Sequence, residues 1–558
     1  MTSLNAQNVS AKWVRQFGTT SYDEGTSMVL DNKGNIYVTG TFQGTADFDP
    51  GSSVFNLSSI GYQDIFISKF DSTGQFIWAK QIGGNNGDND SYSITVDDSC
   101  KVYVTGSFAG TADFDPSVGT FNMTSYNDFH DGFIYYDVFV LKLDSSGNFV
   151  WAKQFGGASH DMGHSITVDA IGNIYTVGEF QDSVDFDPGL GTFNLTAKSI
   201  DVFVSKLDPS GNFIWVKKMG GSQVDWANAI TLDKNNDIIL TGGFQDTVDF
   251  DPGVGIYNLN GSANYDMFVS KLDSSGNFIW AKRISNSVGK AIAVDTAGNV
   301  HTTGYFFGVG DFDPGISTYT LSSASTDIFI SKLDVAGNFI WAKQISGVWD
   351  EIAFSIALDL SGNVYTTGFF QKITDFDPGV GTYTLSTFGV GGTQDIFISK
   401  LDALGNFVWV KQMGGTKIDI GNCIAIDALE NIYTTGQFND IVDFDPNAGV
   451  FNLTSNGNAD VFVHRMSRGN FVGIKENIFK NKIAVYPNPT SGIVNLVFQN
   501  SLNSKSIKLI SVTGIILMEK INFIADKFSI DISLLADGIY FLEINNDGNV
   551  YRTKLLKN

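Results

Sequence analysis

The chain has 558 residues, with 35 basic and 59 acidic side chains and a formal net charge of -24 at pH 7. This charge argues against binding to nucleic acid through its phosphates, which requires clustered lysine and arginine. Hydrophobic residues make up 43% of the chain, which is enough for a large core. Two cysteines exclude a disulfide scaffold, and no apolar run approaches the roughly 18 residues of a transmembrane helix.

Residues 1–10 contain no charged segment and no apolar segment of the kind that begins a signal peptide. Leu4-Asn-Ala6 followed by Gln7 looks like the final part of a signal peptide with its cleavage site. We therefore expect residues 1–10 to be the remnant of a truncated leader. An ordinary disordered N-terminus is the alternative.

Residues 11–474 contain a sevenfold repeat. One unit, residues 165–217, reads as four short β-rich runs separated by Gly/Asn turns, without a helical period. Four antiparallel strands repeated seven times predict an all-β fold, a seven-bladed β-propeller with four-stranded blades. A linear solenoid is the alternative, but it would need distinct polar caps. The repeat is marked by Asp-Phe-Asp-Pro motifs spaced 62 to 72 residues apart, which begin at Asp47, Asp113, Asp185, Asp249, Asp311, Asp375 and Asp443.

The two ends of the repeat region complement each other. Residues 11–18 copy the fourth strand of a unit without the first three. The last unit has three strands and then degenerates at residues 470–474, where the tryptophan of the motif is absent. We therefore predict that the N-terminal strand completes the last blade and closes the propeller.

Each Asp-Phe-Asp-Pro motif places two carboxylates on one face of an extended segment, because residues i and i+2 share a face. Paired carboxylates suit calcium, although calcium wants six to eight oxygens and the motif supplies only two side chains. The alternative is that both carboxylates accept hydrogen bonds from turn amides. The second aspartates of the seven candidate calcium sites are Asp49, Asp115, Asp187, Asp251, Asp313, Asp377 and Asp445.

The loops between the fourth strand of one unit and the first strand of the next are expected to approach the central channel on one face. An acidic residue recurs in them, at Asp23, Asp161, Asp225, Glu351 and Asp419. Carboxylates with aromatic platforms suit a carbohydrate or a cation. The alternative is that the acids cap turns and the aromatics fill gaps. The neighbouring aromatic and imidazole residues, which differ between units, are Tyr22, Tyr92, His160, Trp226 and Trp349.

From residue 475 the repeat stops and alternating apolar runs predict a small Ig-like β-sandwich. The tail contains Val485-Tyr-Pro-Asn-Pro-Thr-Ser-Gly-Ile-Val-Asn-Leu496 and Asp537-Gly-Ile-Tyr-Phe541. It resembles the C-terminal sorting domain of the type IX (Por) secretion system, and the repeats resemble the bacterial SBBP β-propeller family. The resemblance implies export by that machinery to the outer-membrane surface or the extracellular space. The motif residues are Tyr486, Pro487, Asn488, Pro489, Gly492, Gly538 and Tyr540.

Three functions remain open. We expect a monomeric, non-enzymatic binding or adhesion module for a glycan or a surface protein, because the units are uniform and no catalytic motif occurs. A structural surface protein without a ligand is one alternative. The other is a polysaccharide-acting enzyme at the channel mouth, for which His160, His164 and the loop acids would have to converge. Calcium is the only cofactor that we consider, and fold alone does not decide among these functions.

Overall fold

The structure is a computed structural model. It describes residues 9–557 except 86, 127–134, 263, 448, 469–482, 512–515 and 547–548. Two compact units are present, residues 1–468 and 469–558. The expected leader, except for residues 9 and 10, and the expected domain boundary at 474/475 lie outside the described residues. The described part of the chain contains strands and turns and no helix.

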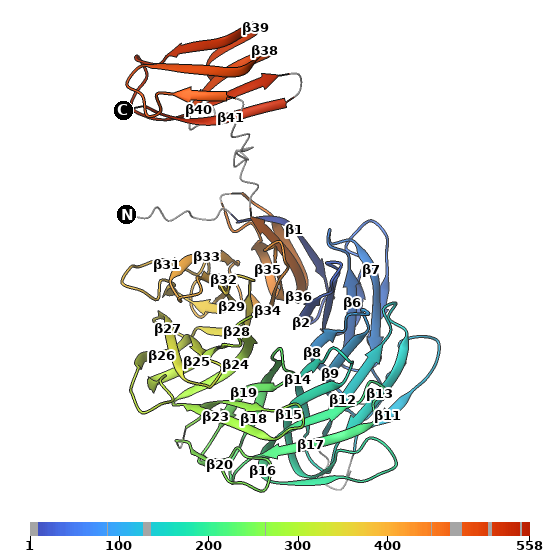
Figure 1. The fold of residues 1–558 in the computed structure, drawn as a ribbon. Coiled ribbons are helices and arrows are strands. Elements are labelled where there is room, and N and C mark those ends of the chain that lie inside the picture. The colour runs from blue at the N-terminus through green and yellow to red at the C-terminus, as the bar shows by residue number, and fades with distance from the viewer. Residues whose placement is uncertain are drawn as a thin grey trace. The chain divides into compact units, whose positions relative to one another are not determined.

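The first unit contains seven four-stranded antiparallel arrangements, here called sheets 1 to 7 in chain order (Figure 1). Within each sheet the four strands lie side by side in sequence order, from the first strand to the fourth. Sheet 7 is the exception, because its fourth strand is β1. The first strands are β2 (Glu24–Leu30), β8 (Asn89–Val96), β14 (Met162–Val168), β18 (Trp226–Leu232), β24 (Ser287–Val294), β28 (Ile352–Leu358) and β34 (Ile420–Ile426). The second strands are β3 (Ile36–Phe42), β9 (Val102–Ala109), β15 (Ile174–Asp185), β19 (Ile238–Phe244), β25 (Val300–Asp311), β29 (Val364–Gln371) and β35 (Ile432–Asp443).

The outer half of each sheet follows the same plan. The third strands are β6 (Asp64–Phe70), β12 (Tyr136–Leu143), β16 (Asn194–Leu207), β22 (Asp266–Leu272), β26 (Thr320–Leu333), β32 (Gln394–Leu401) and β36 (Asn452–Arg468). The fourth strands are β7 (Phe76–Ile82), β13 (Phe149–Phe155), β17 (Phe213–Met219), β23 (Phe278–Ile284), β27 (Phe339–Gly347), β33 (Phe407–Met413) and β1 (Val9–Phe17).

The N-terminal strand β1 pairs with β36 along its length, from Val9 opposite Arg468 to Phe17 opposite Val461. The first strands also contact one another in chain order, from β2 to β34, and β34 in turn contacts β2. Figure 1 shows these strands gathered around the middle of the unit. The two ends of the repeat region are therefore held together by strand pairing and by packing.

Local sequence explains the turns within a sheet. In the turn after β14, Asp169 Oδ1 accepts hydrogen bonds from the backbone N–H groups of Ile171 (3.1 Å) and Asn173 (2.8 Å). Gly172 supplies the positive φ of 87° that the turn requires. The aspartate makes the same two bonds in the other six turns between first and second strands. In sheets 2, 4 and 7 the positive φ is taken by Cys100, Asn236 and Glu430 in place of glycine.

The segment around each Asp-Phe-Asp-Pro motif forms a small outer hairpin, where the sequence suggested only a long connection. The separate hairpins are β4 (Thr45–Asp47) with β5 (Asn56–Ser58), β10 (Thr111–Asp113) with β11 (Asn122–Thr124), β20 (Thr247–Asp249) with β21 (Asn258–Asn260), and β30 (Ile373–Asp375) with β31 (Thr384–Ser386). In sheets 3, 5 and 7 the second and third strands extend far enough to include it.

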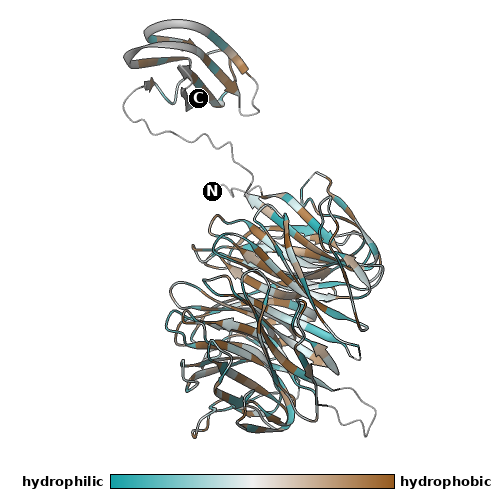
Figure 2. Ribbon diagram, turned by 90° about the vertical axis from the view of Figure 1, so that its right-hand side faces the viewer, coloured by the Kyte–Doolittle hydropathy of each residue, from teal (hydrophilic) through white to brown (hydrophobic). Residues whose placement is uncertain are grey.

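The apolar cores lie between successive sheets. One core cluster joins Val138 and Val140 of sheet 2 to Ile166, Ile174 and Val184 of sheet 3. The phenylalanine of the Asp-Phe-Asp-Pro motif belongs to such a cluster in every repeat. Figure 2 shows apolar residues recurring along the strands of this unit. Each repeat therefore buries its apolar side chains against its neighbours, as stacked repeats require.

The second unit forms one five-stranded antiparallel sheet in which β39 pairs with β38. A cluster that includes Val494, Leu509, Ile530 and Leu542 forms its core. Its strands are β37 (Ile483–Tyr486), β38 (Ile493–Ser511), β39 (Ile516–Asp531), β40 (Gly538–Asn546) and β41 (Asn549–Lys557).

Candidate functional site

The five loop acids expected at the channel mouth are buried, with 0 or 1% of each residue exposed. They support the loops from inside. Asp161, for example, accepts hydrogen bonds from the backbone N–H groups of Gly157 (2.9 Å) and Gln181 (3.1 Å). Asp23, Asp225 and Asp419 likewise accept bonds from two backbone amides each. The geometry corresponds to the turn-capping alternative, and these carboxylates do not line a surface.

A second buried acid lies near each of these loop acids. It is the aspartate that precedes the apolar part of the third strand, such as Asp137 beside Asp161. Burial raises the pKa of Asp137 to about 7. Burial, together with repulsion from Asp137, raises the pKa of Asp161 to about 8. These pairs could not be predicted from the sequence, because their members are far apart in a repeat and come from successive sheets.

A β-bulge occurs at the start of the first strand in every sheet. The side chain at this bulge differs between the repeats. The register of the first and second strands shifts at the same place in all seven sheets. Bulges of this kind re-aim a side chain and are over-represented near binding sites. The residues at the shift, here called the variable ring, are Thr26, Tyr92, His164, Asn228, Lys290, Phe354 and Asn422.

Three members of the variable ring connect neighbouring sheets. Thr26 Oγ1 donates to the Ser91 carbonyl at 2.7 Å, and Asn228 Nδ2 donates to the Gly289 carbonyl at 2.8 Å. Asn422 Nδ2 reaches the Gly25 carbonyl at 3.1 Å. Tyr92, His164, Lys290 and Phe354 have no such bond to a neighbouring backbone among the described residues. Contacts with neighbouring sheets therefore explain the choice of these four half-buried side chains less well than that of the other three.

Acidic side chains gather beside the ring in sheets 1 to 3 and form what we call the acidic arc: Glu24, Asp88, Asp90 and Glu179. The Tyr22 hydroxyl and the Asn422 amide donate to Glu24 at 3.1 and 2.8 Å. Gln63 donates to Asp90 at 2.6 Å. Burial, with repulsion from Asp88 and Glu24, raises the pKa of Asp90 to about 6. The acidic arc thus concentrates negative charge on one side of the ring.

Aromatic and aliphatic side chains gather on the other side, in sheets 4 to 6. This apolar arc consists of Trp226, Tyr265, Tyr305, Ile352 and Phe354. The rings of Trp226 and Tyr265 meet edge to face, with centroids 4.8 Å apart. Phe354 packs on Phe369 at 5.9 Å. The two arcs give this face a polar half and an apolar half.

The expected aromatic residues are divided between these surroundings. Tyr92 belongs to the variable ring and Trp226 to the apolar arc, and Tyr22 donates a hydrogen bond to Glu24 of the acidic arc. His160 lies between the rings of Tyr135 and Tyr136, with centroid distances of 5.2 and 5.3 Å. His164 points instead to Glu179, with Nε2 3.6 Å from the carboxylate, and stacks near Tyr92 at 5.4 Å. Trp349 is 42% exposed, and the Lys372 ammonium lies 4.0 Å from its ring centre.

The carboxylates of the Asp-Phe-Asp-Pro motifs bind backbone amides. Asp47 Oδ1 accepts hydrogen bonds from the N–H groups of Asp49 (3.1 Å) and Phe55 (2.8 Å), and Asp49 Oδ1 accepts one from Gly51 (2.8 Å). The same bonds recur in the other hairpins. No group of three or more His, Cys, Asp or Glu side chains that could hold a metal ion occurs in the part of the chain that the structure describes.

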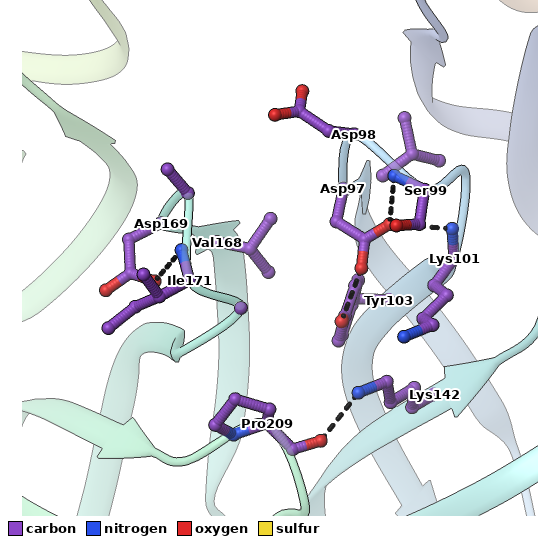
Figure 3. Close-up of a pocket in the computed structure, with 13 residues that line it drawn as sticks. Asp97, Asp98, Ser99, Lys101, Tyr103, Lys142, Val168, Asp169, Ile171 and Pro209 are labelled. Carbon is purple, nitrogen blue, oxygen red and sulfur yellow. Dashed lines mark hydrogen bonds between the residues drawn. The ribbon is translucent and has the colours of Figure 1, made fainter.

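A hollow of about 380 Å³ lies between the turns of sheets 2 and 3 (Figure 3). Its polar groups are engaged in local bonds. Lys142 donates to the Pro209 carbonyl at 2.6 Å, and Tyr103 donates to Asp97 at 3.0 Å. The equivalent lysines Lys69 and Lys206 make the same bond to the following turns. This arrangement belongs to the repeat, and we therefore place the candidate site at the variable ring.

The sorting-motif residues cluster near the end of the tail sheet. The Asn488 amide donates to the Lys554 carbonyl at 2.6 Å, and its oxygen accepts the Leu556 N–H at 2.8 Å. The Tyr540 hydroxyl donates to the Ala536 carbonyl at 2.6 Å. The motif thus ties the loop after β37 to β41. Tyr486 is half exposed. Within the described residues no helix has the length and apolar character needed to cross a membrane.

Comparison with known families identifies both parts of the chain. Residues 484–558 match the family model of the secretion system C-terminal sorting domain. Residues 12–44 and 150–179 match that of the β-propeller repeat. Over these residues the chain is similar to β-propeller repeats and to a sorting domain. The sorting domain indicates export by the type IX secretion system to the cell surface or the extracellular space.

Two curated proteins are similar to parts of the chain. An uncharacterized WD repeat-containing protein of Acanthamoeba polyphaga mimivirus is 24% identical over 507 residues, covering 76% of this chain and 36% of that protein. The regulatory protein FlaEY of Caulobacter vibrioides is 28% identical over 142 residues, covering 25% of this chain and 14% of that protein. The chain therefore matches only about a third or less of the length of either relative.

Three solved structures align with parts of the chain, all with TM-scores below 0.4. The Dos1 propeller is 7% identical, covers 84% of this chain and 97% of its own, and has a TM-score of 0.38. Sqt1 from Chaetomium thermophilum is 12% identical, with coverages of 68% and 96% and a TM-score of 0.32. A protein of unknown function from Bacteroides caccae is 11% identical, with coverages of 50% and 89% and a TM-score of 0.22.

Sequence reasoning missed most of the variable ring. Of its seven positions, only Tyr92 was among the expected ligand residues, and His164 appeared only in the enzyme alternative. The signal was available, because aligning the seven units shows two positions in the first strand that vary while the small residues beside them recur. They are the bulge position and the position two residues before it, which holds Glu24, Asp90, Met162, Trp226, Val288, Ile352 and Ile420.

Proposed function

We propose that this exported protein is a non-enzymatic, monomeric binding module whose ligand is a glycan or a protein. The variable ring with its two arcs is the proposed binding site. The observation that carries this proposal is that the bulge residue, and the residue two before it, vary among repeats whose other first-strand positions are similar. A structural spacer has no need for different half-buried side chains at one position of each repeat. Burial of Asp161, Asp225 and Glu351 also argues against the enzyme alternative, which requires them at the channel mouth.

The architecture proposed for this function is a closed seven-bladed propeller over residues 11–474. It is supported by the contact of β34 with β2 and by the pairing of β1 with β36. We propose that residues 475–558 form the sorting domain as a small Ig-like sandwich. A break in the pairing of β38 and β39, between Val497 and Leu502, supports a bend between two layers.

Calcium binding by the paired aspartates of the hairpins is a separate proposal. It predicts that the melting temperature of the full chain rises in millimolar calcium relative to EDTA, because a ligand that binds only the folded state stabilises it. Equal melting temperatures in calcium and in EDTA would contradict calcium binding. The carboxylates would then have only their observed role in the turns.

The binding function is tested by screening the full chain on arrays of glycans and peptides. We expect selective binding that Trp226→Ala weakens at least tenfold, because an aromatic platform is removed from the apolar arc. Ile171→Ala, an exposed apolar residue in the turns on which Figure 3 centres, is the matched control and should change nothing. Blank arrays, or equal loss in both variants, would favour the structural alternative.

A further inference from the structure

The acidic arc has more acceptors than the protein satisfies. Glu24 and Asp90 come from neighbouring sheets and are close enough to raise the pKa of Asp90. Burial also raises the pKa of Glu24 itself. Both acids are held by neutral donors, namely Tyr22, Asn422 and Gln63. No ion pair of Glu24 or Asp90 with a cationic side chain occurs among the described residues.

Gln437 adds an independent sign of a missing partner. Its residue is 5% exposed, and its side-chain oxygen has no hydrogen-bond partner in the described structure. The same side chain interacts with the Tyr22 hydroxyl, which in turn binds Glu24. A buried acceptor without a donor costs free energy, so a donor supplied by a ligand would complete this corner of the site.

We infer that the acidic arc receives an ammonium or guanidinium group carried by a protein segment, with an apolar side chain of that segment on the apolar arc. This inference rests on the proposed binding function and specifies its ligand. The organic cation would donate to Glu24, Asp90 and the free oxygen of Gln437. Charge-assisted hydrogen bonds of this kind are about twice as strong as neutral ones.

The shape of the site favours a protein segment over a metal ion or a glycan. The acids are spread over β2, β8 and β15, and no three of them converge as a metal site requires. Lys290 interacts electrostatically with Glu179. The apolar arc then offers Trp226, Ile352 and Phe354, which suit an apolar side chain. A basic residue next to an apolar one matches both halves.

The test uses the full chain and a fluorescein-labelled peptide of alternating lysine and phenylalanine. Its control is the same peptide with acetylated lysines, which keeps the length and removes the charge. We expect binding of the first peptide and at least tenfold weaker binding of the second. Asp90→Asn should weaken binding about tenfold, or 1.4 kcal/mol, because Asn keeps an acceptor for Gln63 but no charge.

A matched variant tests whether the basic peptide is attracted non-specifically to an acidic protein. Asp98→Asn removes the same charge from an exposed turn beside the hollow of Figure 3, and it should leave the affinity within about twofold. The affinity should also rise about five- to tenfold from pH 5 to pH 7.5 as Asp90 ionises, because its pKa is raised to about 6. The other titratable groups on this face include Tyr22, Asp88, Tyr92, His164, Glu179, Tyr265, Lys290 and Tyr305.

Three results would overturn the inference. Equal binding of the acetylated peptide would show that charge is not recognised. Equal effects of Asp90→Asn and Asp98→Asn would show that the acidic arc is not the site. Binding of a glucosamine hexamer without binding of the peptide would assign the cation to a sugar, in which case the proposed function stands and this inference fails. If no array ligand binds at all, both fail.

Discussion

At the scale of single residues, burial decides what the acids of this protein do. Asp161 and Asp225 look like candidates for ligand binding in the sequence, because acidic loop residues are usually solvated. In the structure their oxygens accept backbone N–H groups inside the loops. The sequence could not reveal this, because an acid that caps a turn and an acid that lines a channel occupy the same loop positions.

These buried acids predict an unusual pH dependence of stability. The pKa is raised to about 8 in Asp161, about 7 in Asp225 and Asp419, and about 9 in Glu351, with burial as the main cause. The folded chain therefore binds more protons than the unfolded chain between about pH 4 and pH 9, and the free energy of unfolding falls as pH rises through that range.

We expect a higher melting temperature at pH 6 than at pH 9, measured by circular dichroism, and a smaller difference in Asp161→Asn. The lowered pKa values of His301 and His464, about 4 and 3, act in the opposite direction below pH 6.5, because these buried rings resist protonation. A melting temperature that increases steadily up to pH 9 would contradict this assignment.

At the scale of elements, the strand order of a unit could be predicted because short β-rich runs alternate with Gly/Asn turns. The pairing of the N-terminal strand with the last unit could also be predicted, because a lone fourth strand at one end complements its absence at the other. The bulge could not, because a one-residue shift in pairing leaves no trace in the apolar pattern of a single strand. Only comparison of all seven units exposes it.

The contribution of β1 can be measured with one substitution. Phe17 is buried, with ring centroids 5.0 Å from Phe48, 5.2 Å from Phe66 and 6.0 Å from Phe70. Phe17→Ala should lower the free energy of unfolding by about 3–5 kcal/mol, as measured by urea denaturation. Lys12→Ala, exposed on the same strand, is the control and should cost less than about 0.5 kcal/mol. Equal and small effects would mean that β1 is not integral to the last sheet.

At the scale of the whole molecule, the chain combines a repeated scaffold with variable side chains at the start of each first strand. The export tail and the repeat class could be recognised from short motifs, which carry fold and address. The ligand could not be recognised from the sequence. The side chains that distinguish the repeats come together only when seven first strands surround a common centre. Tyr92, His164 and Phe354 are separated by about 70 or more residues in the sequence yet share one face.

The most direct test compares the array binding of the full chain with that of a ring variant carrying Tyr92→Thr, His164→Thr and Phe354→Thr. Threonine already occupies the ring position in sheet 1, so the scaffold should accept it. The account predicts that the variant keeps its melting temperature within a few degrees and loses the ligands that the natural chain selects. A folded variant that keeps the same ligands would place the binding site elsewhere and contradict the central claim.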